Sequence, residues 1–372
     1  MSNETEHDSL AGIFFADDAN IWATGRSISG HEQDQFGNYE LSFQPNFVDR
    51  EEVNALRIKP AETVKKDVEA IVSAMADHTE ISELKIVTTA SLGPFKENRT
   101  GFNNSGKIIH APRAEKWAAI DLHKIVSDTF EEFGNKNITV RCLHDAEAFV
   151  IGEHYLQRQM RLKRDKIGSE AYRKDERALA QETVAYFLLD QGVGGAVLRN
   201  NSFVRGETAL EFGHLPIYPA FEDEHRFPIS DCGAHSLPCL EGTVSIEALA
   251  KKWKLTLDDY LQLPADAEAL HWIGYYVAQA IHMIVLTHSP TTFFLGGRLV
   301  NNEYLVPHVR GFYDVIGRNR RNGRMYPGYD SQYKLGKFIK RWTFPDTGVL
   351  GCLCWSRKQL DAATNPNVFQ FP

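Results

Sequence analysis

Short apolar and alternating runs at the start of the chain predict three consecutive strands. They are AGIFFADD from Ala11, NIWATGR from Asn20 and YELSFQPN from Tyr39, and turn residues separate them. From Glu62 the apolar positions recur at helical spacing, and the buried-strand pattern LKIVTTAS follows from Leu84. A second helical pattern at residues 122–133 leads into the strand-like run ITVRCLHD. Strands followed by alternating helix and strand predict an α/β fold.

The same pattern begins again in the second half of the chain. The strand-like runs there are TVAYFLLD from Thr183, GGAVLRN from Gly194, SFVRG from Ser202 and TTFFLGG from Thr291. Two halves built on one plan predict two lobes with a cleft between them. We place the smaller lobe at residues 10–143 and the larger at 144–347, with a helical insertion at 156–180, where acids dilute a run of basic residues.

Bulk composition agrees with a two-domain globular protein. The chain has 372 residues, of which 43% are hydrophobic and 24% charged. The net charge of -8 disfavours nucleic acid and membrane partners. No uninterrupted apolar run reaches the roughly 20 residues that cross a bilayer, and the polar start is unlike a signal peptide, so we expect a cytoplasmic protein. Five cysteines are too few for a disulfide scaffold, and reduced thiols, some on a metal, fit better.

Asp145 stands where a predicted strand meets a predicted helix. Ligands of α/β sheets bind beyond the carboxyl ends of the strands, and the loops after Ser91, His144, Leu189 and Leu295 all lie there. A carboxylate at that edge can accept the proton of a substrate hydroxyl, as general-base catalysis of phosphoryl transfer requires. The alternative is that Asp145 only caps the helix.

Histidine and cysteine residues with short spacing indicate a metal site. The candidate ligands are His214, Cys232, His235 and Cys239. A structural zinc site needs four such ligands in a tetrahedron. A pair of cysteines without metal is the alternative. Glycines at 192, 194 and 195, and again at 296 and 297, follow strands, so their amides can cradle phosphate. The alternative is that these short motifs are glycine-rich turns.

Four segments in this order resemble motifs of the ROK family of sugar kinases and sugar-responsive regulators. They are His144-Asp145, Asp190 to Gly195, Leu210 to His214, and Cys232 to Glu241. The family pairs an Asn-Asp strand end, a Gly-Thr-Gly-x-Gly-Gly phosphate loop, a Gly-Glu-x-Gly-His segment and a Cys-x-Cys-Gly-x-x-Gly-Cys-x-Glu zinc loop. The resemblance runs from about Ala11 to the helix after Gly348. The run from Ser91 to Phe95, with Gly106 and residues 112–117, is similar to the fructokinase-like branch.

The resemblance implies a two-lobed actin-like, ribonuclease H-like ATPase fold, with a C-terminal helix at 348–372 completing the smaller lobe. It implies ATP and magnesium as cofactors, a structural zinc ion, a sugar as small-molecule partner, and a homodimer. Asp145 would be the catalytic base. The implied sugar-binding residues are Asn104, His144, Glu211, His214 and Glu241. The implied nucleotide-binding residues are Gln191, Gly192, Gly194, Gly195, Gly296 and Gly297.

Several positions depart from the family pattern. The first strand ends in Asp17-Asp18 where the family has Asp-x-Gly-Gly-Thr, so a phosphate there meets like charge unless magnesium intervenes. Asp190-Gln191 replaces Gly-Thr in the second phosphate loop. Ala234 replaces the middle cysteine of the zinc loop, and His235, water or loss of zinc are the alternatives. His144 replaces asparagine and brings a titration near neutral pH.

The sugar half of the pattern is therefore kept, and the nucleotide half is altered. Three hypotheses follow. The first is an ATP-dependent hexose kinase with Asp145 as base. The second is a ROK-like sugar-binding protein without phosphoryl transfer. The third is an enzyme that processes a sugar without nucleotide, using Asp145 with His144 or Glu211 as acid and base.

Overall fold

The computed structural model describes residues 10–15, 20–27, 41–48, 61–93, 95–97, 104–108, 120–161, 169–206, 209–220, 222–223, 232–234, 236–318, 335–344 and 346–364. The chain divides into two compact units. The first comprises Met1–Ala180, Arg205–Ala209 and Asp346–Pro372, and the second comprises Gln181–Val204 and Leu210–Pro345.

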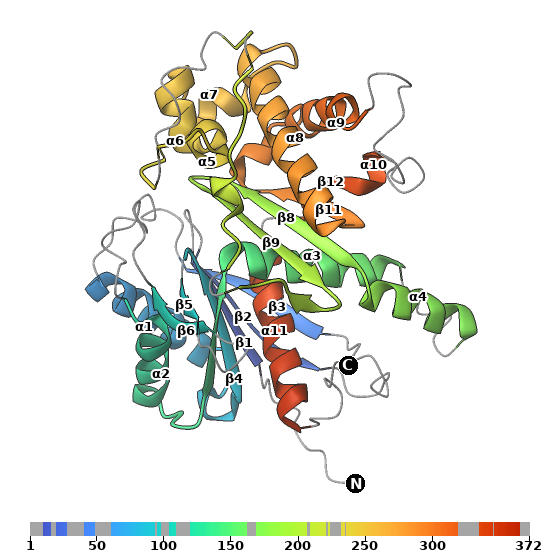
Figure 1. Ribbon diagram of the computed structural model, residues 1–372. Helices are drawn as coiled ribbons and strands as arrows, with labels where there is room; N and C mark the ends of the chain where they lie inside the picture. The colour runs from blue at the N-terminus through green and yellow to red at the C-terminus, as the bar shows by residue number, and fades with distance from the viewer. Residues whose placement is uncertain are drawn as a thin grey trace. The chain divides into compact units, whose positions relative to one another are not determined.

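The first unit is built on a five-stranded sheet with the order β3-β2-β1-β4-β7 (Figure 1). Its elements are β1 (Leu10–Phe15), β2 (Asn20–Ser27), β3 (Leu41–Val48), α1 (Ala61–Ala76), η2 (Ile81–Glu83), β4 (Ile86–Ser91), β5 (Phe95–Glu97), β6 (Asn104–Ile108), α2 (Leu122–Glu132), β7 (Thr139–His144), α3 (Asp145–Arg161), α4 (Glu170–Ala180) and α11 (Thr347–Thr364). The pairs β1–β2 and β2–β3 are antiparallel, whereas β1–β4 and β4–β7 are parallel. The strands expected from the sequence in this half are confirmed.

Helices cover both faces of this sheet because the side chains of each strand alternate between the faces. On one face, Ala11 and Ile13 of β1 join the apolar stripes of α1 and α2 in one core. On the other, β1 packs against α11, where Gly348 lies so close that a β-carbon would stand 2.5 Å from the ring of Phe14. A β-carbon on Gly351 would stand 1.8 Å from the carbonyl oxygen of Ala148, so α11 and α3 cross at very short range.

The second unit repeats the plan with a sheet of order β10-β9-β8-β11-β12. Its elements are β8 (Thr183–Leu189), β9 (Val193–Arg199), β10 (Ser202–Phe203), η5 (Phe212–His214), α5 (Leu240–Val244), α6 (Ile246–Ala248), η6 (Leu249–Trp253), α7 (Leu257–Leu261), α8 (Glu268–His288), β11 (Thr292–Gly296), η7 (Arg298–Asn301), α9 (Leu305–Ile316), α10 (Leu335–Phe338) and β12 (Ile339–Arg341). Here too β8–β9 and β9–β10 are antiparallel, and β8–β11 and β11–β12 are parallel. The prediction of two halves on one plan is confirmed.

The two units are bounded differently from the lobes predicted at 10–143 and 144–347. The boundary lies at Ala180/Gln181, because α3 packs against α11 and the sheet of the first unit. The predicted insertion at 156–180 corresponds to the end of α3 and to α4. Helix α11 spans Thr347–Thr364 and belongs to the first unit, where the sequence predicted a C-terminal helix at 348–372.

By length and composition alone, helix α8 could cross a membrane. Polar residues interrupt its apolar run, so the sequence did not predict this. However, 67% of its most apolar window is buried within the structure. Ile273, Val277 and Ile281 lie in the main core of the second unit. Its apolarity is that of a central core helix.

Candidate functional site

Two loops at the carboxyl ends of β8 and β11 form one edge of the second sheet. Gly296 and Gly297 end β11, and the β-carbon that a side chain would add at Gly297 would stand 2.2 Å from the carbonyl oxygen of Leu189. Gly297 also has a φ of 95°, a conformation that glycine adopts without strain. The absence of a side chain therefore brings the start of η7 directly against the end of β8.

A carboxylate from the chain fills the space between these two loops. Asp190 accepts hydrogen bonds from the backbone amide of Gln191 at 2.7 Å and from the backbone amide of Arg298 at 2.9 Å. The Nε of Arg298 donates to it at 2.7 Å, and a terminal nitrogen of the same guanidinium forms an ion pair with it. Arg298 was not singled out from the sequence, because a lone arginine after a Gly-Gly pair carries no signal of its own.

Two further hydrogen bonds within the chain engage backbone amides of the predicted phosphate loop. The amide of Asp190 donates to the carbonyl of Gly192 at 2.9 Å, and the amide of Val193 donates to Oε2 of Glu241 at 2.8 Å. Gly195 makes room for packing, since a β-carbon there would stand 2.6 Å from the ring of Phe212. In this arrangement the loop does not fit a phosphate group, because chain carboxylates hold the amides that a phosphate would need.

The predicted sugar-binding residues of the second unit lie together next to this loop. Glu211 immediately precedes η5, which carries His214 at its end, and Glu241 is in the first turn of α5. The two loops are joined by the pair Pro216 and Cys239 and by the bond from the amide of Leu240 to the carbonyl of Leu215.

Two of these residues are carboxylates whose charges interact. Loss of hydration raises the pKa of Glu211, and the neighbouring charge of Glu241 raises it further. Two adjacent carboxylates with an imidazole provide hydrogen-bond acceptors for several hydroxyl groups of one ligand.

Three potential metal ligands converge beside these residues. One ligand atom each of His214, Cys232 and Cys239 lies within 4.8 Å of the others, and both cysteines are buried. The two sulfur atoms accept N–H···S hydrogen bonds from the amides of Ala234 and Gly242, each at 3.4 Å. Donors of this kind support metal-bound thiolates, so the set fits zinc with one position left for a fourth ligand. His235, the predicted fourth ligand, lies outside the described residues.

Asp145 belongs to the first unit, where it is the first residue of α3. The backbone amide of Ala146 donates to its Oδ1 at 2.6 Å. Glu147, the third residue of α3, accepts a hydrogen bond at 3.0 Å from the backbone amide of His144, the residue before the helix, and so satisfies one free amide at the helix start. Whether Asp145 acts as a general base or as a helix cap stays a prediction. Its predicted place beside Glu211 and Glu241, which belong to the second unit, stays a prediction.

His144 is buried beneath the loop that follows β4. Its ring contacts the ring of Phe95 with centroids 4.9 Å apart and fills the space beside Gly93. Burial lowers the pKa of His144 to about 4, and the Glu147 charge only partly offsets this. The expected titration near neutral pH is therefore wrong, because the apolar surroundings keep the ring neutral.

Glu147 and Arg205 form a buried ion pair that sequence analysis missed. Nε of Arg205 lies 2.5 Å from Oε1 of Glu147, and a second guanidinium nitrogen donates to Oε2 at 2.6 Å. Burial alone would raise the pKa of Glu147, but the Arg205 charge and the bond from the His144 amide hold it below its ordinary value. The pair ties Arg205, which belongs to the first unit, to α3.

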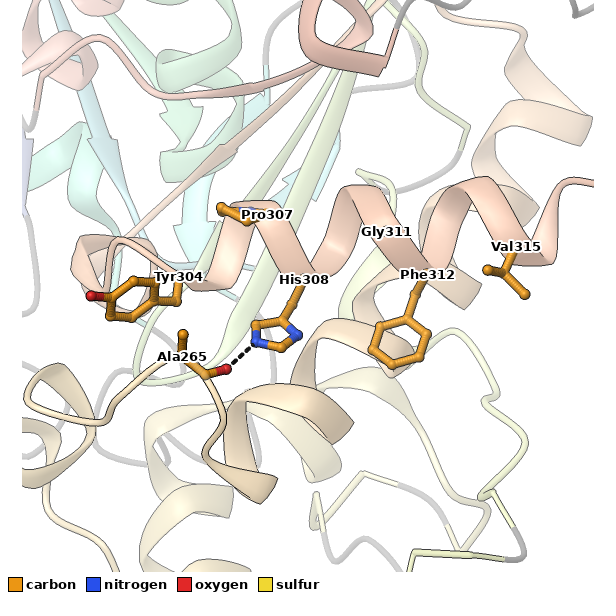
Figure 2. Close-up of a pocket in the computed structure, with 7 residues that line it drawn as sticks. All are labelled: Ala265, Tyr304, Pro307, His308, Gly311, Phe312 and Val315. Carbon is orange, nitrogen blue, oxygen red and sulfur yellow. Dashed lines mark hydrogen bonds between the residues drawn. The ribbon is translucent and has the colours of Figure 1, made fainter.

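The remaining predicted residues are only partly described. Asn104 begins β6, and only its backbone is described. Asp17 and Asp18, the expected magnesium region, lie outside the described residues. A separate apolar pocket of about 390 Å³ lies along α9 (Figure 2). It is lined by Ala265, Tyr304, Pro307, His308, Gly311, Phe312 and Val315, so the predicted site residues are not part of it.

The sequence is similar to a known protein family and to individual sugar kinases. The sequence matches the model of the ROK family over residues 43–320. A fructokinase of Pediococcus pentosaceus is 29% identical over 125 residues, which cover 34% of this chain and 41% of that protein. The chain thus spans less than half the length of this relative.

Solved structures confirm the fold. The ROK hexokinase from Thermus thermophilus has a TM-score of 0.56 at 17% identity, covering 95% of this chain and 99% of that one. A ROK family glucokinase from Streptomyces griseus, in complex with glucose and AMPPNP, has a TM-score of 0.58 at 14% identity, covering 94% and 99%. The predicted actin-like α/β fold is confirmed at this level. The match over most of the sequence shows that this chain belongs to the ROK family.

Proposed function

We propose that the protein is a sugar kinase that phosphorylates a hydroxyl group of a hexose, with Asp145 as the general base. The observation that carries the proposal is the grouping of Glu211, Glu241 and His214 beside a zinc-type ligand set in a chain of the ROK family. ATP with magnesium is the donor expected for this reaction. The predicted nucleotide loop is filled by the carboxylates of Asp190 and Glu241.

In the proposed reaction the protein's own residues bind and orient the sugar. Glu211 and Glu241 accept hydrogen bonds from ring hydroxyls. His214 would ligate zinc through one nitrogen and contact the sugar through the other, so the metal would fix the ring that touches the substrate. Asp145 would accept the proton of the reacting sugar hydroxyl as general base. His214, Cys232 and Cys239 would hold a zinc ion, which would tie their loops together.

A coupled assay of the purified protein with ATP, magnesium and a panel of hexoses tests the proposal. Asp145→Asn should lower kcat by about 100-fold or more and leave the KM for the sugar nearly unchanged, since the base acts in the transition state. Asp128→Asn is a matched control, because Asp128 is an exposed carboxylate on α2 paired with Lys124. Absence of turnover on every hexose, with sugar binding intact by calorimetry, would overturn the proposal.

A second candidate function is sugar binding without phosphoryl transfer. It is favoured by the occupation of the phosphate loop by Asp190, which is bound to Arg298 and to the amide of Gln191. Micromolar binding of ATP would count against this candidate. Product analysis with nucleotide omitted separates it from nucleotide-free sugar chemistry. Homodimerisation and a cytoplasmic location stay predictions, and light scattering tests the first.

A further inference from the structure

The surroundings of the Asp190 carboxylate have the composition of an anion-binding site. Four donors converge on it: the backbone amides of Gln191 and Arg298 and two nitrogens of the Arg298 guanidinium. Backbone amides combined with an arginine fork are the groups that proteins use to hold phosphate. The side chains of Arg298 and Asp190 are only 22% and 14% exposed, so this pair is more than a surface contact.

The backbone holds two of these four donors, the amides of Gln191 and Arg298, at this edge of the sheet. The β8–β11 pairing sets Leu188 against Gly296 at the end of the two parallel strands. The close approach of Gly297 to Leu189 then fixes the amide of Arg298 at the same edge. A site at the carboxyl edge of parallel strands is where α/β proteins bind ligands. The donors therefore form a preformed pocket for negative charge, and the chain fills it itself.

A second carboxylate has a similar role one residue beyond the turn. Glu241 accepts from the amide of Val193, which follows Gly192 in the same loop. An incoming polyphosphate would have to remove a carboxylate from the amides of this loop or bind beside it against like charge. Both the occupied donors and the local negative charge oppose polyphosphate binding.

We propose that the Asp190 carboxylate is an internal substitute for a phosphate group: it fills an anion site made by the amides of Gln191 and Arg298 and the Arg298 guanidinium, and a polyphosphate binds there only when Asp190 leaves. This inference rests on the proposed function, because it concerns the donor half of that site. It makes Asp190 the residue that limits affinity for nucleotide, and Arg298 the residue that would bind the anion after release.

The test measures binding of inorganic tripolyphosphate and of AMPPNP by calorimetry, without sugar and without turnover. Asp190→Ser should raise the affinity for both by about tenfold or more, since it removes a like charge and frees the donors. Adding Arg298→Met to this variant should remove the gain. Asp314→Ser is the matched control, because it also removes one carboxylate from an aspartate–arginine pair of the second unit, with Arg318, and should leave affinity unchanged.

Equal affinity of Asp190→Ser and the wild type overturns the inference, as does an equal gain in the Asp314→Ser control. Asp190→Asn, which keeps the side-chain volume and one carbonyl oxygen, is a second variant in case the serine substitution impairs folding. Wild-type crystals soaked in tripolyphosphate give a readout that needs no variant. An anion on the amides of Gln191 and Arg298 with Asp190 turned away, or an intact pair without anion, agrees with the inference. An anion bound to this loop while Asp190 keeps its bonds to Arg298 contradicts it.

These outcomes are separable from those of the proposed function. Wild-type turnover with no gain in Asp190→Ser defeats the inference and leaves the kinase proposal standing. A gain in Asp190→Ser without turnover by the wild type on any hexose supports the inference and favours the sugar-binding candidate.

Discussion

Two buried histidines of the first unit should make the protein lose stability as the pH falls below neutrality. His144 and His154 are only 7% and 4% exposed. Nε2 of His154 lies 3.2 Å from the carbonyl oxygen of Leu179, and because a carbonyl only accepts, this nitrogen carries the proton of a neutral ring. Burial lowers the pKa of His154 to about 3, with the Arg158 charge second, and that of His144 to about 4.

The pH window follows from these values. In the unfolded chain both rings take a proton below about pH 6.5, whereas in the folded chain they remain neutral until about pH 4 or below. Between these limits the unfolded state binds more protons, so the free energy of unfolding rises with pH and is lost on acidification. At pH 5.0, about 1.5 units below the unfolded value, each histidine costs roughly 2 kcal/mol relative to pH 7.5.

Urea unfolding followed by circular dichroism at pH 7.5 and pH 5.0 measures this loss. His154→Gln keeps a nitrogen donor for Leu179 but has no proton to gain. It should therefore lose roughly 2 kcal/mol less than the wild type between the two pH values. If the variant loses as much as the wild type, the neutral buried ring is not the source of the acid sensitivity, and the reasoning is refuted.

Three further predictions concern the metal ligands and the packing. Cys232→Ser should reduce bound zinc, measured by mass spectrometry, well below the level of the wild type, and an unchanged zinc content would exclude Cys232 as a ligand. Gly351→Ala should lower the free energy of unfolding by about 3 kcal/mol, because its β-carbon meets the backbone of Ala148; stability equal to that of the wild type in urea would contradict the close crossing. Arg205→Met should lower the free energy of unfolding by about 3 to 5 kcal/mol at pH 7, because it leaves the Glu147 charge buried without its partner. The loss should be smaller at pH 4, where Glu147 of the variant takes a proton, and a loss that does not depend on pH would argue against a buried charge.

Within the described residues, local patterns were sufficient for the strands of the two large sheets other than β12 and for α1, α2 and α3, whereas β5, β6 and the individual helices α5 to α10 were not predicted. Val64, Val68 and Ile71 recur at helical spacing and are fully buried in α1, as periodicity predicts. Phe133 also fitted a helical stripe, yet it is 37% exposed because α2 ends at Glu132. Helix ends depend on local capping, which apolar spacing alone does not show.

The pairs that complete the candidate site were beyond sequence reasoning. Asp190 and Arg298 are 108 residues apart, and Glu147 and Arg205 are 58 apart. The first pair forms only when the fold brings the ends of β8 and β11 together. The second forms only when the fold brings Arg205 against α3. The family motif identified Asp190 as a departure, but only the fold shows that its carboxylate takes over the donors of the phosphate loop. The two compact units meet at Ala180/Gln181, beyond the predicted lobe boundary at 143, because α3 packs against α11 far along the chain.

Because α11 is the last described helix and covers β1 and α3, the first unit is assembled from segments that are far apart in the sequence. During synthesis, the strands of the first unit are made well before this helix, and the face of β1 around Gly12 and Phe14 stays open until α11 has been made. The second unit, by contrast, can close as soon as residue 344 is clear of the exit tunnel. Chaperone dependence during synthesis should therefore be greatest for the half of the protein that is made first.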